Sequence, residues 1–65
     1  MNIKGWNVTV SDDGRYLYVS QGGSPGEIHI KQEDEGYVVD IWSDDDPPTS
    51  VASTAATYRE LERED

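Results

Sequence analysis

Four short runs of alternating apolar and polar residues constrain the fold of this chain more than any other feature. The first run is Trp6-Asn7-Val8-Thr9-Val10, and the others cover residues 15–20, 27–31 and 37–42. Successive side chains of a β-strand point to opposite sides of a sheet, so a period of two residues predicts half-buried strands. We therefore expect four strands, each with one apolar face.

Turn residues between these runs predict how the strands connect. Ser11-Asp12-Asp13-Gly14 separates the first two runs and Glu33-Asp34-Glu35-Gly36 the last two, and both are rich in residues that favour tight turns. Between the two pairs lies Gly22-Gly23-Ser24-Pro25-Gly26, which is too flexible to belong to a strand. The pattern predicts two hairpins in a four-stranded antiparallel β-meander.

The loop length of the first hairpin decides which side chains share a face. A three-residue loop, residues 12–14, pairs Val10 with Tyr16, whereas a two-residue loop pairs Val10 with Leu17. We predict the three-residue loop, because Gly14 suits the left-handed position that such a loop requires. That register places Trp6 on the same face as the tyrosines.

The second hairpin has a simpler pattern. Its turn ends at Gly36, and the resulting register separates two sets of side chains. One face holds Ile28, Ile30, Tyr37, Val39 and Ile41, and the other holds His29, Lys31, Val38, Asp40 and Trp42.

The segment Val10-Ser11-Asp12-Asp13-Gly14-Arg15-Tyr16-Leu17-Tyr18-Val19-Ser20 resembles a hairpin found in blades of β-propeller proteins of the YVTN type. The resemblance implies the same turn geometry. A propeller needs several four-stranded blades, and this chain has no repeat of that period, so no propeller and no function are inferred.

The composition changes after Pro47-Pro48, which end the predicted sheet because proline cannot donate to a strand ladder. The residues that follow favour a helix, with Ser50 or Ser53 as N-cap. With Ser50 as N-cap, Val51 is the first helical residue; we prefer Ser53, because Val51-Ala52 could then pair briefly with the end of the fourth strand as a short fifth strand. A stripe of Ala55, Tyr58 and Leu61 would then cover one face of the sheet, giving an α+β fold.

Charge is distributed unevenly along the 65 residues. Residues 1–32 carry three acidic and three basic side chains, whereas residues 33–65 carry eleven acidic and two basic ones, which accounts for the whole net charge of -9. Nucleic acids and anionic membranes repel such a surface, because affinity for them depends on Lys and Arg. We expect a basic protein surface as the partner.

Few chemical functions are compatible with the composition. There is no Cys, and His29 is the single His, so the only candidate enzyme cluster is His29, Asp40 and Trp42. The acidic runs lack the spacing of a calcium loop, and the glycines lack the Lys-Ser/Thr of a phosphate loop. We expect a non-enzymatic protein with no metal or cofactor. No apolar run is long enough for a membrane span or signal peptide, so we expect a cytoplasmic location.

These observations predict a small acidic domain, residues 1–65, that acts as a protein-interaction module. The expected partner-binding residues are Asp44, Asp45, Asp46, Glu60, Glu62 and Trp42. A narrower alternative is a phage- or plasmid-type DNA mimic that inhibits a nucleic-acid-binding enzyme. A second alternative is that the acidity reflects a high-salt habitat, and the oligomeric state is left open.

Overall fold

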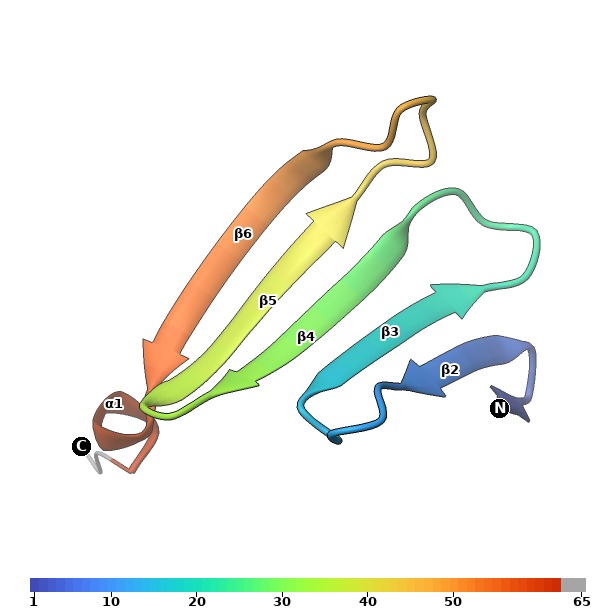
Figure 1. Ribbon diagram of the computed structural model, residues 1–65. Coiled ribbons are helices and arrows are strands. Elements are labelled where there is room, and N and C mark those ends of the chain that lie inside the picture. Colours follow the sequence, from blue (N-terminus) through green and yellow to red (C-terminus); the bar gives the residue numbers. More distant parts are fainter. Residues whose placement is uncertain (63–65) are drawn as a thin grey trace.

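The computed structural model describes residues 1–62 and consists of one antiparallel sheet with a single helical turn at its end (Figure 1). The strands follow one another in chain order, each paired with the next. Their bounds are β1 Asn2–Ile3, β2 Trp6–Val10, β3 Tyr16–Gln21, β4 Glu27–Glu33, β5 Gly36–Trp42 and β6 Ser50–Thr57, followed by α1, Tyr58–Leu61. The antiparallel meander is confirmed, with six strands instead of four.

The largest departure from expectation is β6, which occupies most of the predicted helix. Ala52 does pair with Ile41 of β5, with Val51 at a register shift beside it, and the pairing continues to Thr57, opposite Gly36. A short isolated helix is marginal in water, and the free edge of β5 offers backbone partners to a segment in which four of eight residues are Ser or Thr. The helix therefore begins after Thr57 and not after Ser53.

The short helix α1 does not cover the sheet. It has four residues and lies beside the end of β6, as Figure 1 shows. Tyr58 packs edge-on against Tyr37, with 5.3 Å between ring centroids, while Leu61 remains 57% exposed. The predicted covering stripe is therefore wrong, because Ala55 belongs to a strand. The end of the predicted helix, residues 63–65, lies outside the described residues.

The first hairpin has the other register. Val10 pairs with Leu17, not with Tyr16, so our prediction of a three-residue loop was wrong. Ser11 and Tyr16 lie opposite each other beyond the ladder, where the Ser11 amide donates to the Tyr16 carbonyl at 3.0 Å. Gly14 does adopt a positive φ of 75°. The tyrosines consequently lie on the opposite face from Trp6.

The second hairpin has the predicted register. Ile28 pairs with Ile41 and Ile30 with Val39, and the strands are joined by the two-residue turn Asp34-Glu35. Together with the first hairpin, this gives the sheet one apolar face across all its long strands. Its half-buried members are Val8, Leu17, Val19, Ile28, Ile30 and Val39, and its more exposed members are Trp6, Val10, Tyr37 and Ile41.

No apolar side chain of residues 1–62 is buried, because the sheet is a single layer. The radius of gyration is 13.5 Å, compared with about 10.7 Å for a compact chain of this length. Gly36 is the one residue of this range classed as buried. The apolar face therefore has no second layer within the described part of the chain.

Candidate interaction surfaces

The second face of the sheet, which we call the polar face, carries a row of aromatic rings. Tyr16 and Tyr18 stack with centroids 6.3 Å apart, Tyr18 meets His29 edge-on at 4.8 Å, and His29 stacks on Trp42 at 5.5 Å. Lys31 lies 5.6 Å above the Tyr16 ring. The row crosses β3, β4 and β5, and aromatic pairs of this kind help to fix strand pairing.

The structure brings together the three residues of the candidate enzyme cluster. His29 is the register partner of Asp40 and stacks on Trp42. The contact of its ring is with Glu27, however, at 3.3 Å from Nε2 to Oε2. Within residues 1–62 no three metal-ligating side chains gather at one point. The cluster thus has the geometry of an aromatic stack, with no aligned nucleophile and base.

Trp42 has one unusual feature. Its indole Nε1 is buried, although the side chain as a whole is half-buried, and it has no hydrogen-bond partner among the described residues. Buried indole N–H groups normally find an acceptor, because an unpaired donor costs about 1–3 kcal/mol.

The predicted partner-binding carboxylates lie in two places. Asp44, Asp45 and Asp46 are in the loop between β5 and β6, next to Trp42, and we call this end of the sheet the loop end. Glu60 and Glu62 lie at α1, at the opposite end of β6, which we call the turn end (Figure 1). The six predicted residues therefore do not form one continuous surface.

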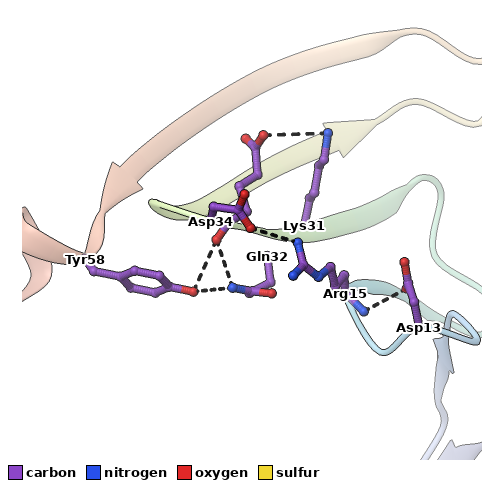
Figure 2. Close-up of polar contacts among 7 residues, drawn as sticks. Asp13, Arg15, Lys31, Gln32, Asp34 and Tyr58 are labelled. Atoms are coloured by element: carbon purple, nitrogen blue, oxygen red, sulfur yellow. Dashed lines mark hydrogen bonds and ion pairs between the residues drawn. The ribbon is translucent and has the colours of Figure 1, made fainter.

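Polar contacts tie together the elements at the turn end (Figure 2). Arg15 Nη1 bonds Asp34 Oδ1 at 3.1 Å and so joins the turns of the two hairpins. Gln32 Nε2 donates to the Tyr58 hydroxyl at 2.5 Å, which holds α1 against β4. Lys31 and Glu33 form a looser pair at 3.8 Å. Exposed ion pairs of this kind contribute at most about 1 kcal/mol each.

Asp13 organises the first turn. Its carboxylate accepts hydrogen bonds from the Ser11 hydroxyl at 2.6 Å and from the Arg15 amide at 3.0 Å. These bonds, first of all that from Ser11, lower the pKa of Asp13 below its ordinary value, because they favour the charged form.

Acidic residues also surround a hollow of about 520 Å³ at the turn end. Its walls come from the β4–β5 turn, the end of β6 and α1, and they include the side chains of Glu33, Asp34, Glu35 and Glu60. Glu60 also caps the helix, since its side chain accepts from the Thr57 amide at 2.9 Å.

Sequence reasoning missed one local signal at this end. Thr57 and Glu60 form a capping box. The Thr57 side chain accepts a hydrogen bond from the Glu60 amide, and the Glu60 carboxylate accepts one from the Thr57 amide. The spacing Thr57-Tyr58-Arg59-Glu60 is visible in the sequence and marks the true start of α1. It also places Glu60 in the first helical turn, where a carboxylate is favourable.

Comparison of the chain with protein-family profiles, with curated proteins and with solved structures gave no match. No helix within residues 1–62 has the length and apolar character required to cross a membrane.

Proposed function

We propose that this chain is a non-enzymatic protein-interaction module whose acidic loop end binds a basic surface on a partner protein. The observation that carries the proposal is the juxtaposition at the end of β5. Three consecutive carboxylates, Asp44 to Asp46, begin two residues after Trp42, an aromatic residue with an unpaired indole N–H among the described residues.

This combination suits a protein contact. Tryptophan is enriched among the residues that dominate binding energy, and carboxylates at the rim of an interface accelerate association with a basic partner. No ion pair or hydrogen bond is formed by the side chains of Asp44, Asp45 and Asp46 among the residues that the structure describes, so their charge is uncompensated locally.

The test compares two variants with the same change in net charge at opposite ends of the sheet. The first is Asp44→Asn, Asp45→Asn, Asp46→Asn. The second is Asp12→Asn, Glu35→Gln, Glu62→Gln, three turn-end residues whose side chains likewise make no polar contact within residues 1–62.

Proteins captured from an extract by the wild-type chain at low salt would be identified and purified, and their association rates measured at several salt concentrations. We expect a basic partner, an association rate lowered about tenfold by the loop-end variant at low salt, and a weaker salt dependence. An equal loss of association rate in both variants, or the absence of a basic partner, would contradict the proposal. The acidity would then be explained by solubility or by a high-salt habitat.

The identity of the partner would also test the narrower DNA-mimic hypothesis. If the captured protein is a nucleic-acid-binding enzyme, duplex DNA should compete with the chain for it. Binding that DNA does not affect would exclude mimicry while leaving the acidic interaction module intact.

A further inference from the structure

The apolar face differs from the rest of the molecule in carrying no charge. The charged residues within the strands are Glu27, Lys31, Glu33 and Asp40, and strand alternation places all of them on the polar face. A sheet with one apolar face normally packs it against a second layer. Neither α1 nor any other part of residues 1–62 supplies that layer.

We propose that the second layer is another copy of this chain, and that two copies pack their apolar faces together as a β-sandwich. Dimers with twofold symmetry are the commonest soluble oligomers, and in them the same surface patch of each copy meets its equivalent. The apolar face and the acidic loop end adjoin at one place, because the hollow near Trp6 and Ile41 is also lined by Trp42 and Asp44, so the two proposals are separated by their tests.

The exposed area of the chain supports this assignment. The accessible surface is 5290 Å², whereas a compact monomer of 7.3 kDa exposes about 4,200 Å². The excess is about 1,100 Å², and a stable dimer of standard size removes about 800 Å² from each partner. One face-to-face contact would therefore bring the chain to the surface area expected for its mass.

Charge favours a second copy over a charged partner. Two chains of net charge -9 repel one another through most of their surface, but an uncharged face lets them meet without burying a carboxylate. Sheets in a sandwich lie about 10 Å apart, so the charged side chains of the two polar faces would point outward into solvent. A basic partner would instead find its complementary charge at the ends of the sheet.

The apolar face carries both hollows and exposed large side chains, which suits a contact between two copies of the same face. A hollow of about 450 Å³ near Trp6, Ile28 and Ile41 extends to Trp42 and Asp44 at the loop end. A smaller one of about 270 Å³ is lined by Tyr37, Val39 and Leu61 of α1. Trp6 and Tyr37 are 41% and 42% exposed beside these hollows. In a twofold arrangement the large side chains of one copy can fill the hollows of the other, as close packing requires.

Neighbouring valines on β5 provide a matched test. Val39 lies on the apolar face and Val38 on the polar face, and both are half-buried. Val39→Glu and Val38→Glu add the same charge, one residue apart. Sedimentation equilibrium of the full chain at 1–200 μM should give twice the 7.3 kDa mass for the wild type and for Val38→Glu. Val39→Glu should raise the dimer dissociation constant by about 100-fold or more, because it buries unpaired charge.

Thermal unfolding keeps the proposal testable if Val39→Glu fails to fold. When folding and dimerisation are coupled, the melting temperature of the wild type must rise with chain concentration. Dimer affinity should also increase between 0.05 and 0.5 M NaCl, because salt screens like charges. Binding to a basic partner should weaken over the same salt range. The opposite salt dependences allow the dimer and the acidic contact to be tested separately. A folded wild-type monomer at 200 μM, or a Val39→Glu dimer as tight as Val38→Glu, would overturn the dimer.

Discussion

The two faces of the sheet are built from the same strands and yet have opposite chemistry. The apolar face is mainly aliphatic, with Trp6 and Tyr37 near its ends and the uncharged Gln32 and Thr54 among its members, whereas the polar face combines aromatic rings with every charged strand residue. On the polar face, side chains of adjacent strands already contact one another. The apolar side chains gain most from a second layer, because hydrophobic stabilisation depends on area removed from water. The comparison therefore locates where further association should be strongest.

The largest expected difference between the faces is in stability. Ile30 lies on the apolar face between Leu17 and Val39, and the next residue, Lys31, lies on the polar face. If the apolar face is covered, Ile30→Ala should lower the free energy of unfolding by about 2–4 kcal/mol, whereas Lys31→Ala should cost less than about 1 kcal/mol. Urea denaturation at a fixed chain concentration measures both. Equal, small losses would mean that the apolar face stays in water.

A second prediction concerns the close approach of Gly36 on β5 to the backbone of β6 at the turn end of the sheet. A Cβ at Gly36 would overlap the backbone carbonyl oxygen of Ala56 on β6. Gly36→Ala should therefore destabilise the fold by about 1–3 kcal/mol, because the β5–β6 pair must separate locally. Gly22→Ala is the control, since its Cβ would meet only the Gly5 oxygen at 3.7 Å. A Gly36→Ala variant as stable as Gly22→Ala would contradict the close approach of β5 and β6.

A third variant, Trp42→Phe, separates structural from binding roles on the polar face. It keeps a ring for stacking on His29 but removes the buried, unpaired indole N–H. We expect stability to change by less than about 1 kcal/mol, because the lost area and the removed unpaired donor oppose each other. Because Nε1 is buried, binding of the basic partner should weaken only if Trp42 reorients so that the partner accepts a hydrogen bond from Nε1. Thermal melts and binding measurements of this variant and of Tyr18→Phe as control would show the difference.

The smallest effect is expected at Asp13, in an exposed turn away from both faces. Its pKa is lowered in the folded chain, so its stabilising contribution is present above the ordinary pKa of about 3.9 and is lost as pH falls through the lowered value. Asp13→Asn should slightly lower the melting temperature at pH 7, and the difference from wild type should shrink below about pH 4. Asp12→Asn, whose side chain accepts no bond among the described residues, should differ little at either pH. A difference that does not shrink at all as the pH falls below about 4 would contradict this role.

Turn and strand preferences alone could not decide whether Val10 of the first hairpin pairs with Tyr16 or with Leu17. Gly14 favoured the three-residue loop, and the alternating pattern of residues 15–20 is compatible with either face turned inward. Leu17 and Val19 lie opposite Ile30 and Ile28 of β4, and only the pairing of Val10 with Leu17 places Val8 and Val10 on this same aliphatic face. Aliphatic neighbours on three strands outweigh the preference of a single turn.

The sequence by itself determined the central meander, the faces of the second hairpin and the left-handed Gly14, because side-chain alternation and turn chemistry act between residues close in the chain. Only the tertiary structure decided that Ser50–Thr57 is a strand, because it pairs with the free edge of β5. Helix propensity depends on residue type alone and does not include pairing with a neighbouring strand. The same pairing shortened the helix to Tyr58–Leu61, separated Glu60 and Glu62 from the loop-end aspartates, and left the apolar face without a covering layer.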